Sequence, residues 1–490
     1  MKKSVKSRTE NRPKAVVFFG GVSVEHDVSV VTGLMTAAAM SKNFDVLRIF
    51  VDKSGLWRIA PSSSEPLNFG EKGEFDKFKK CSIFADGVIS IKNFQGYKPI
   101  FKPDIGVICF HGGSGEGGGA AGLLCMCGIP CINGGVALHS IAIDKSLLKK
   151  LALSAKIPVL PHVFVDKCDW IKDKTNIEQC YKRVENANIN CTDSENTCDE
   201  SRNADFSSNC SCALNSDLAA ENSNENEIDY VKNASINLHN MKESDYNANF
   251  SEIKRYKCGN SMEACKKSKC NCKKNVDFHD AEIESYKLKI ILEAEKFCYP
   301  MIVKPCSLGS SIGVSCVHSR QELVEALETV FCLDTGAMIE PKLKNLIEVN
   351  CAVAKIKGKT VATQLEKPLT KGEILDFSDK YMMFGKKGTN RIFPWEGECV
   401  EEIQDYSKTI YDLLSGRGPV RADWFVSDGK PYLNEINAVP GSLANYLFEE
   451  DFPTLLWELY EQTLADEKEK TELIRTVNSP VLSGKGSKSL

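Results

Sequence analysis

Two carboxylates and one amide in the C-terminal third of the sequence have the spacing of a metal site on a hairpin. Residues 421–437 alternate between apolar and polar side chains around Asp428-Gly429, which favours a tight turn between two strands. Side chains of a strand alternate between its faces, so Glu435 and Asn437 share one face of the second strand and Asp423 lies on one face of the first. Such oxygen ligands suit Mg²⁺ carrying a nucleotide phosphate. A hairpin with its charges facing water is the alternative.

The metal hypothesis requires a particular register between the two strands. Asp423 lies opposite Glu435, and Arg421 opposite Asn437, if the loop is odd in length or carries a bulge. A plain two-residue turn at Asp428-Gly429 would put the two carboxylates on opposite faces. The hypothesis therefore predicts an odd or bulged connection.

A segment rich in glycine and serine could bind phosphate groups. Residues 304–313, Lys-Pro-Cys-Ser-Leu-Gly-Ser-Ser-Ile-Gly, follow an apolar strand at 301–303. Small residues at this density let backbone N–H groups close around phosphate oxygens. The lysine precedes the loop and no Gly-Lys-Ser/Thr follows, so this is not a Walker A loop. A tight turn in solvent is the alternative.

Two acidic residues lie near the end of another expected strand. Residues 337–341 form an apolar run that includes Glu340, and Glu348 follows shortly after. A carboxylate at such a point can accept hydrogen bonds from a ribose or an amine. A surface acid is the commoner explanation for either residue alone.

The scaffold for these residues is predicted to be an α/β fold. A buried apolar strand at 15–20 leads through a glycine turn into a helix over 28–40, and further strands are expected at 45–51 and 105–110. This order is typical of an open, mostly parallel sheet. Ligands of such sheets bind at the carboxyl ends of strands, so the glycine loop 111–119 is a candidate binding loop.

The composition changes abruptly between about residues 168 and 281. This segment is rich in Asn, Ser, Asp, Glu, Lys and Cys and poor in large apolar residues. It cannot bury enough surface to offset the entropy of ordering, so we expect a disordered, low-complexity insertion. Its cysteines lack the regular paired spacing of a structural zinc site, so adventitious or no metal binding is expected there, with a structural zinc as the alternative.

Length, charge and cysteine content narrow the class of protein. A chain of 490 residues suggests two to four domains, and its net charge of −4 gives no reason to expect nucleic-acid binding. No run of about 18 apolar residues predicts a membrane span, and the polar N-terminus does not resemble a signal peptide. The 21 cysteines are scattered, which favours free thiols in the cytoplasm.

Seven separated motifs, taken in order, resemble the D-alanine–D-alanine ligase family of the ATP-grasp superfamily. The N-terminal motif is Phe-Phe-Gly-Gly-Val-Ser-Val-Glu-His-Asp-Val-Ser at 18–29. The others are His111-Gly-Gly-Ser-Gly-Glu-Gly-Gly, Gly128-Ile-Pro with Ala142-Ile-Asp-Lys145, the 304–313 loop, Lys380-Tyr381, Arg421-x-Asp423, and Asn434-Glu-Ile-Asn-x-x-Pro-Gly441. The resemblance covers about residues 14–166 and 284–465.

The resemblance implies an N-terminal open parallel-sheet domain followed by a two-lobed ATP-grasp fold. We expect the N-terminal α/β substrate domain at 14–134. The central lobe is expected at 135–338, interrupted by the insertion at 168–281, and the C-terminal lobe at 339–466. Residues 467–490 are expected to form a disordered tail.

The implied reaction joins two D-alanines with ATP to give D-alanyl-D-alanine for the peptidoglycan of the cell wall. ATP would phosphorylate the carboxylate of the first D-alanine, and the amine of the second substrate would displace the phosphate. Carboxylate is a poor electrophile, so catalysis rests on positioning and charge neutralisation. The implied cofactors are ATP and two Mg²⁺ (or Mn²⁺) ions.

The resemblance also implies roles for individual residues around ATP. Those expected to hold the ATP phosphates are Lys145, Lys304, Ser307, Gly309, Ser311 and Gly313. Glu340 and Glu348 would lie at the adenine and ribose end. The two metal ions would be held by Asp423, Glu435 and Asn437, and Lys380 would approach the transferred phosphoryl group.

At the substrate end, Glu25 would receive the ammonium of the first D-alanine. Glu25, Ser310 and Tyr381 would form a hydrogen-bonded set that closes loops over the substrate and excludes water. Arg421 and the backbone N–H of Gly441 would stabilise charge on the reacting acyl oxygen. His111 would lie near the second substrate, where an imidazole can make a contact that responds to protonation of the amine.

Three departures from the family pattern concern the second substrate. The family's Gly-Glu-Asp-Gly reads Gly115-Glu-Gly-Gly118, and Ala438 follows Asn437 where threonine is usual. Tyr446, next to Leu447, stands where a small hydroxyl often anchors the second substrate's carboxylate. Tyr381 favours an amine over D-lactate, so D-alanine is the first choice and D-serine the second.

Two other classes of function stay open. One is a different ATP-grasp ligase that joins another carboxylate to another amine, although the N-terminal motif and Lys380-Tyr381 argue against it. The other is a non-catalytic binding protein, which the presence of Asp423, Glu435 and Asn437 disfavours. We expect small-molecule substrates, no nucleic acid, no membrane and a homodimer.

Overall fold

The computed structural model describes residues 12–70, 74–173, 286–369 and 391–471. Within these residues the chain forms two compact units. The first contains residues up to 160, residues 305–314 and residues from 343 onward, and the second contains residues 161–304 and 315–342. Among the described residues no helix is both long and apolar enough to cross a membrane, and the cysteines are free thiols.

The first unit begins with a mostly parallel sheet in the order β3-β2-β1-β7. Its strands are β1 (Lys14–Gly20), β2 (Asp45–Val51), β3 (Trp57–Ala60) and β7 (Ile105–Ile108). β1 runs parallel to both β2 and β7, and β3 adds an antiparallel edge. Every residue of β1 after Lys14 is buried, as expected for a central strand covered on both faces. The predicted open, mostly parallel sheet is confirmed.

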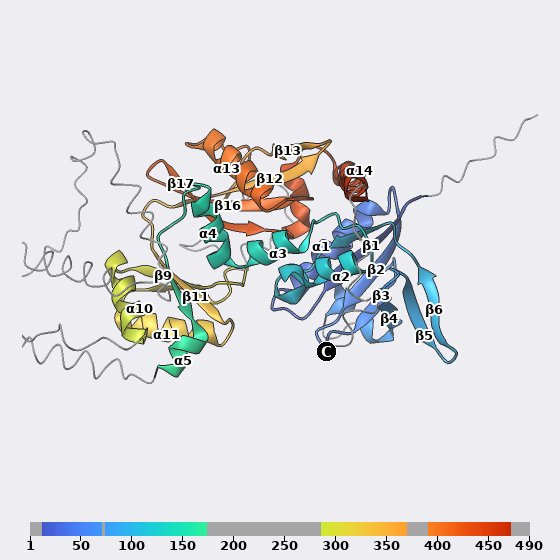
Figure 1. Ribbon diagram of the computed structural model, residues 1–490, viewed down its shortest axis with the longest axis horizontal. Coiled ribbons are helices and arrows are strands. Elements are labelled where there is room, and N and C mark those ends of the chain that lie inside the picture. Colours follow the sequence, from blue (N-terminus) through green and yellow to red (C-terminus); the bar gives the residue numbers. More distant parts are fainter. Residues whose placement is uncertain (1–11, 71–73, 174–285, 370–390, 472–490) are drawn as a thin grey trace, which may run out of the picture. The chain divides into compact units, whose positions relative to one another are not determined.

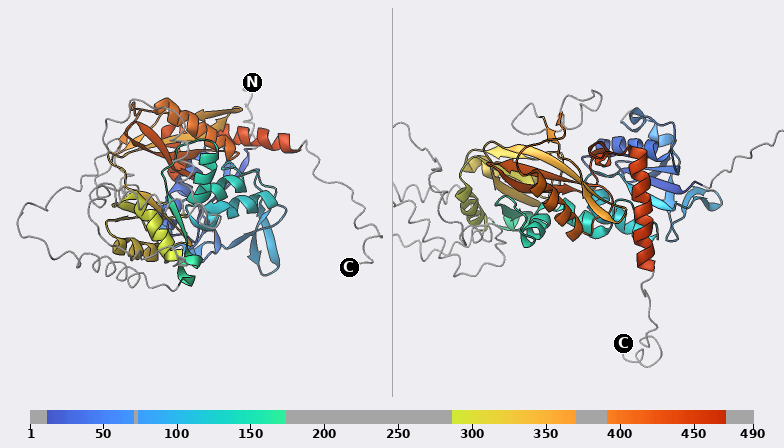
Figure 2. Two further views of the ribbon diagram at one scale, coloured as in Figure 1. Left: turned by 60° about the vertical axis from the view of Figure 1, so that its left-hand side comes forward. Right: turned by 90° about the horizontal axis from the view of Figure 1, so that it is seen from above.

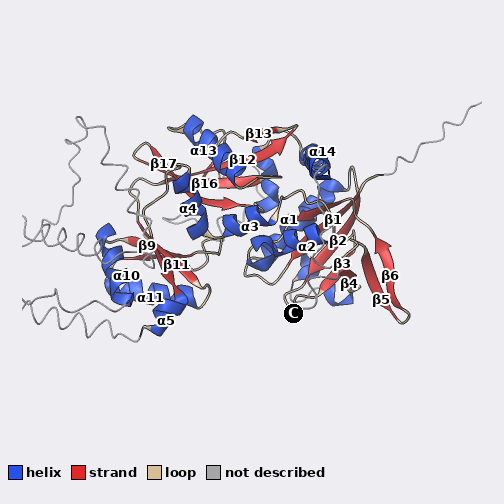
Figure 3. Ribbon diagram, viewed as in Figure 1, coloured by secondary structure: helices blue, strands red, loops and turns tan. Residues whose placement is uncertain are grey.

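Helices and a small second sheet surround this N-terminal sheet (Figures 1 and 3). α1 (His26–Met40) packs against β1. The short π-helical turn η3 (Gly115–Gly119) leads into α2 (Ala120–Met126), and α3 (Val136–Ile143) and α4 (Lys145–Ser154) follow. The remaining elements are the 3₁₀ turns η1 (Pro66–Phe69) and η2 (Phe75–Lys77) and the sheet of β4 (Cys81–Ile83), β5 (Ile89–Asn93) and β6 (Gly96–Phe101).

An antiparallel sheet in the order β13-β12-β16-β17 completes the core of the first unit. Its strands are β12 (Ile347–Ile356), β13 (Lys359–Ala362), β16 (Val420–Ser427) and β17 (Lys430–Asn437). Trp424 is buried beneath it and donates its indole N–H to Ser407 Oγ of α13 (Val400–Leu413) at 3.0 Å. A hydrogen bond of this kind lets the largest core side chain be buried without leaving its polar atom unpaired.

Four further elements belong to this unit. They are the short sheet of β14 (Lys367–Pro368) and β15 (Arg391–Ile392), the irregular turn η7 (Gly441–Leu447) and the long helix α14 (Phe452–Thr471). α14 is seen lengthwise in the right-hand view of Figure 2 and packs against α1. Phe44 contacts the rings of Trp457 and Tyr460 at 5.5 and 5.1 Å between centroids.

The second unit has its own sheet, in the order β10-β9-β11-β8. Its strands are β8 (Val163–Asp166), β9 (Met301–Pro305), β10 (Ser315–Val317) and β11 (Gly336–Pro341). Its helices are α5 (Lys167–Lys172), α10 (Tyr286–Ala294), η6 (Glu295–Phe297) and α11 (Arg320–Phe331). Asp166 and Ser319 cap α5 and α11 by accepting hydrogen bonds from first-turn N–H groups.

Two segment boundaries read from the sequence differ from the elements observed. α5 occupies the start of the expected insertion, and its Trp170 is buried against Phe331. α14 continues to Thr471, so the first residues of the expected tail are helical. The rest of the insertion, from 174, and the tail from 472 lie outside the described residues.

Candidate active site

The hairpin with the expected metal ligands turns through two residues. Asp428 and Gly429 have φ values of 49° and 72°, the left-handed pair of a type I′ turn, and Ser427 pairs with Lys430. Glycine adopts this conformation without the penalty that a Cβ brings. Such a turn alone would put Asp423 and Glu435 on opposite faces.

A β-bulge in the return strand restores the register that a metal site needs. Asp423 pairs with Glu435, whereas the next residue, Trp424, pairs with Leu433. Asn434 is therefore the extra residue of the bulge. The predicted pairing of the two carboxylates is confirmed, with the extra residue in the strand and not in the turn.

The polar face of the hairpin carries a dense set of hydrogen bonds. Arg421 donates to both carboxylate oxygens of Asp423, from Nε at 2.6 Å and from Nη2 at 2.7 Å. Asn437, opposite Arg421 in the ladder, donates from Nδ2 to Asp423 Oδ2 at 3.0 Å. Asp423 thus has a bidentate ion pair, the strong form of carboxylate recognition.

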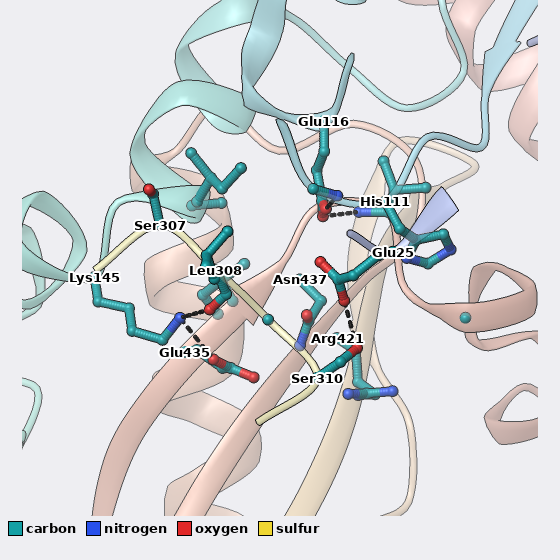
Figure 4. Close-up of a pocket in the computed structure, with 17 residues that line it drawn as sticks. Glu25, His111, Glu116, Lys145, Ser307, Leu308, Ser310, Arg421, Glu435 and Asn437 are labelled. Carbon is teal, nitrogen blue, oxygen red and sulfur yellow. Dashed lines mark hydrogen bonds and ion pairs between the residues drawn. The ribbon is translucent and has the colours of Figure 1, made fainter. Parts of the chain in front are cut away.

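Lys145 reaches the same face from the start of α4. Asp144 caps this helix, because its carboxylate accepts hydrogen bonds from the backbone N–H groups of Ser146 and Leu147 in the first turn. Lys145 Nζ lies 2.6 Å from the Leu308 carbonyl oxygen and 3.2 Å from Glu435 Oε2 (Figure 4). Burial lowers the pKa of Lys145, but the charge and hydrogen bond of Glu435 outweigh it, so the pKa is raised overall.

The 307–313 loop contacts the start of α1. Ser310 and Ser311 both have left-handed backbones, with φ of 54° and 58°. This conformation is uncommon for residues with a Cβ and is held where surrounding contacts compensate for it. Ser310 donates its hydroxyl to the buried carboxylate of Glu25 (Figure 4). The expected pairing of Glu25 with Ser310 is thus present, and Tyr381 lies outside the described residues.

His111 is buried just beyond β7. Its Nε2 lies 3.0 Å from the hydroxyl oxygen of Thr32 in α1. Burial, together with the positive charge of Arg421, lowers the pKa of His111 to about 3. The imidazole is therefore neutral near pH 7. Its own charge would not change when the amine of the second substrate gains or loses a proton.

Glu116 is a site residue that the sequence analysis did not assign. It lies in the π-helical turn η3, accepts a hydrogen bond from Gly112 N at 2.6 Å and receives another from Val439 N at 3.4 Å. Burial and the negative charge of Glu25 raise its pKa to about 8. A signal was available, because Glu116 is the only ionisable side chain in the glycine loop 112–119.

Ten of the twenty expected site residues line one pocket of the first unit. The predicted residues in its wall are Glu25, His111, Lys145, Ser307, Gly309, Ser310, Arg421, Glu435, Asn437 and Gly441. The wall also contains Glu116 and several backbone segments. Figure 4 shows the labelled side chains around this pocket, with Lys145 pointing toward Glu435 and Ser310 toward Glu25.

Other expected residues lie elsewhere. Tyr446 places its hydroxyl 3.5 Å from Arg421 Nη1, and Leu447 is buried in a small apolar cluster. Glu348 pairs with Phe425 in the β12–β16 ladder. Ser311 and Gly313 belong to the 307–313 loop but are not among its residues that line the pocket, which are Ser307 to Ser310. In the second unit Lys304 and Glu340 form a buried ion pair of 2.7 Å, and Lys380 lies outside the described residues.

The oxygen atoms of the hairpin fit a hard divalent cation. No group of three His, Cys, Asp or Glu side chains gathers as a metal cluster in the described parts of the chain. The hairpin set is different, because it combines the paired carboxylates of Asp423 and Glu435 with the amide of Asn437. Each carboxylate lies beside a cation, Arg421 or Lys145. Such donors suit Mg²⁺ or Mn²⁺.

Comparison with known proteins gives consistent matches along the chain. Residues 14–134 match the family model for the D-ala D-ala ligase N-terminus, and residues 269–452 match that for the D-ala D-ala ligase C-terminus. Over 200 residues the chain is 42% identical to the D-alanine–D-alanine ligase of Campylobacter concisus, covering 40% of this chain and 55% of the relative. Over 191 residues it is 38% identical to that of Helicobacter pylori, covering 39% and 53%. The chain thus spans about half the length of the curated relatives it matches.

Solved structures resemble the whole fold. The crystal structure of D-alanine–D-alanine ligase from Helicobacter pylori has a TM-score of 0.55 at 23% identity, covering 92% of this chain and 99% of that one. VanG D-Ala:D-Ser ligase from Enterococcus faecalis has a TM-score of 0.55 at 19% identity, with the same coverage. At these identities the likeness shows the fold, and the ATP-grasp architecture expected from the sequence is confirmed.

Proposed function

The chain belongs to the D-alanine–D-alanine ligase family, and we propose that it is an ATP-dependent ligase that joins two D-alanines through a D-alanyl phosphate. The observation that carries this proposal is the single pocket in which Glu25 with Ser310 lies near Lys145 with Glu435. One pair suits the ammonium of an amino acid, and the other suits a metal-bound phosphate. A ligase that activates a carboxylate with ATP needs both.

Charge exchange explains how the pocket would accept ATP. Lys145 and Arg421 lie at hydrogen-bond distance from Glu435 and Asp423. When the phosphates of ATP enter, Lys145 would turn to the phosphate oxygens and Arg421 to the acyl oxygen, which would leave the carboxylates of Glu435 and Asp423 to hold the metal. Bound Mg²⁺ would neutralise the charge that builds up on the transferred phosphoryl group. The exchange keeps every buried charge paired, which a low-dielectric pocket requires.

The reaction then follows from positioning. Glu25, held by Ser310, binds the ammonium of the first D-alanine and directs its carboxylate toward the phosphate end of the pocket. A carboxylate oxygen attacks the γ-phosphorus, and ADP leaves. The amine of the second substrate attacks the acyl carbon, loses a proton and expels inorganic phosphate. Arg421 and the N–H of Gly441 stabilise the oxygen of that carbon.

The remaining assignments rest on family membership. We assign Lys304, Ser307, Gly309, Ser311, Gly313, Glu340 and Glu348 to ATP binding, and Lys380 and Tyr381 to the phosphoryl and substrate ends. Tyr446 and Leu447 are assigned to the second substrate, with D-serine as the alternative to D-alanine. We further propose two metal ions per site, a homodimer and a cytoplasmic location.

A phosphate-release assay tests the function directly. Purified protein with ATP and Mg²⁺ is supplied with D-alanine, D-serine, D-lactate or L-amino acids, and the product is identified by mass spectrometry. We expect release with D-alanine and formation of D-alanyl-D-alanine. Failure to turn over with every D-amino acid would refute the ligase assignment.

A variant of the metal face tests the site. Glu435→Ala should abolish ATP-dependent release while the protein stays folded, because it removes one of two carboxylates from the proposed metal ligands. Retained activity would contradict the metal assignment.

Light scattering of the protein as it leaves a size-exclusion column decides between monomer and homodimer.

A further inference from the structure

We propose that Thr32 is a positioning residue that fixes the tautomer of His111, so that the neutral imidazole presents its Nδ1–H toward the pocket. The contribution to catalysis rests on the proposed function, whereas the tautomer itself is a property of the protein alone. The sequence motifs do not single out Thr32, and its hydrogen bonds assign it this role.

Thr32 lies on the buried face of α1, between two parts of the site. Its hydroxyl oxygen is 3.0 Å from His111 Nε2 and 3.2 Å from the backbone nitrogen of Ser442 in η7. The side chain is 2% exposed, so bulk water does not compete for these contacts. Ser442 is 410 positions away in the sequence.

The direction of the Thr32 hydrogen bonds follows from which groups can donate. The Ser442 N–H can only donate, so the Thr32 oxygen accepts from it. The hydroxyl proton then needs an acceptor, because a buried hydroxyl without one is costly. Thr329 and Thr463 give their protons to the carbonyl oxygens of Glu325 and Leu459, four residues earlier. Among the described residues Thr32 makes no such bond, and His111 Nε2 is the acceptor within reach.

This bond decides where the imidazole proton lies. A nitrogen that accepts a hydrogen bond carries no proton, so the single proton of neutral His111 is on Nδ1. His111 is in the wall of the pocket, and the described residues place no hydrogen-bond partner on Nδ1. Nδ1–H is thus available to donate to an oxygen of the substrate, and Nε2 is not available to take a proton from the amine.

The conformation of η7 supports this role. Ser442, Leu443 and Ala444 follow one another with φ of 52°, 51° and 49°. Three consecutive left-handed residues with side chains are unfavourable and need compensating contacts. Such contacts include the bond from Leu443 N to Pro440 O at 2.8 Å, the bond from Asn445 Nδ2 to Ser442 O at 2.7 Å and the bond from Ser442 N to Thr32 at 3.2 Å. The turn therefore aims an N–H group at Thr32, and through it orients His111.

Nitrogen NMR of protein labelled with ¹⁵N-histidine tests the tautomer without substrate. The His111 signals are assigned by comparison with His111→Asn. We expect a protonated Nδ1 and an unprotonated Nε2 in the wild type and in Thr32→Ser, and a shift toward the Nε2–H form in Thr32→Val. Thr36→Val, the same change one turn along the buried face of α1, should leave the spectrum unchanged. An Nε2–H form in the wild type, or an unchanged tautomer in Thr32→Val, would overturn the proposal.

Ligase kinetics supply the second measurement. In folded Thr32→Val we expect kcat/KM for the second D-alanine to fall about tenfold, the effect of losing roughly 1.4 kcal/mol of transition-state stabilisation. In Thr32→Ser this kcat/KM should stay within about twofold of the wild-type value, and in Thr36→Val it should equal that value. Equal rates in Thr32→Val and the wild type would remove the catalytic part of the proposal. If the wild type ligates no D-amino acid, the proposed function fails and the NMR result still decides the role of Thr32.

Discussion

Removing one partner of the Lys145–Glu435 pair should destabilise the protein far more than removing a surface pair. The two side chains are 3.2 Å apart and only 8% and 15% exposed. At an effective dielectric constant of about 20, unit charges at this distance attract by roughly 5 kcal/mol. Much of this offsets the loss of hydration, but breaking a buried pair still costs about 3–5 kcal/mol because one charge is left uncompensated.

The Glu435→Gln variant should fall at the lower end of that range. Lys145 keeps its hydrogen bond to the Leu308 carbonyl, and the negative charge of Glu25 is nearby. We therefore expect a loss of about 3 kcal/mol, which corresponds to a fall in Tm of at least about 5 °C for a unit of this size. Lys145→Met should cost less, because Glu435 is the more exposed partner.

A double-mutant cycle isolates the pair itself. The double variant Lys145→Met/Glu435→Gln should be more stable than the sum of the single losses predicts, with a coupling of about 2 kcal/mol. Denaturation is followed by tryptophan fluorescence, since Trp424 is buried beneath the same hairpin. The exposed pair Lys77–Glu74, 2.7 Å apart, is the matched control and should show no measurable coupling. Additive losses in the Lys145–Glu435 cycle would refute the reasoning.

Three other variants test the glycine loop and its neighbours. In Gly112→Ala a Cβ at φ +68° would lie 2.6 Å from Ser23 Oγ and 2.8 Å from Glu25 Oε2. We therefore expect KM for the first D-alanine to rise at least about tenfold. The control variant Gly122→Ala, whose Cβ would lie 3.5 Å from its nearest neighbour, should bind D-alanine normally. Glu116 has a pKa of about 8 instead of 4.5, so the folded protein holds a proton that the unfolded chain releases; Tm should fall as pH rises through this window, and Glu116→Gln should remove that slope. His111 has a pKa of about 3 instead of 6.5, so the unfolded chain takes up a proton that the folded protein does not; Tm should fall as pH drops from 6.5 toward 3, less steeply in His111→Asn. An unchanged pH profile in either variant would show that its group does not shift as described.

The sequence was sufficient where function depends on local order. Apolar alternation predicted both strands of the hairpin, and the demand that Asp423 face Glu435 predicted an odd or bulged connection, of which the structure shows the bulge. The position of the bulge was also readable, because the buried residues Leu433 and Ile436 are three apart where strand alternation would make them two apart. A continuous apolar run at 15–20 and the order of strand, glycine turn and helix likewise predicted the parallel N-terminal sheet.

The sequence was insufficient where a role depends on distant contacts. Glu116 joins the glycine loop to Val439, 323 positions away, and no local pattern predicts such a bond. Thr32 looks like any other residue on the buried face of an apolar helix until Ser442 lies beside it. The charge state of His111 depends on burial and on Arg421, which are known only once the unit is folded.

The bulge at Asn434 also makes chain length part of the chemistry. The buried residues of β17 have odd numbers before the bulge, at Pro431 and Leu433, and an even number after it, at Ile436. Inserting one residue between the turn and Leu433 would keep every ligand in the sequence, yet with a single bulge the ladder would pair Asp423 with Asn434 and rotate Glu435 and Asn437 toward the core. Deleting Asn434 itself would remove the bulge and leave Asp423 opposite Glu435 in a regular hairpin. Relatives of this protein should therefore tolerate loss of the bulge residue, or an insertion paired with a deletion, but not a lone insertion in this strand.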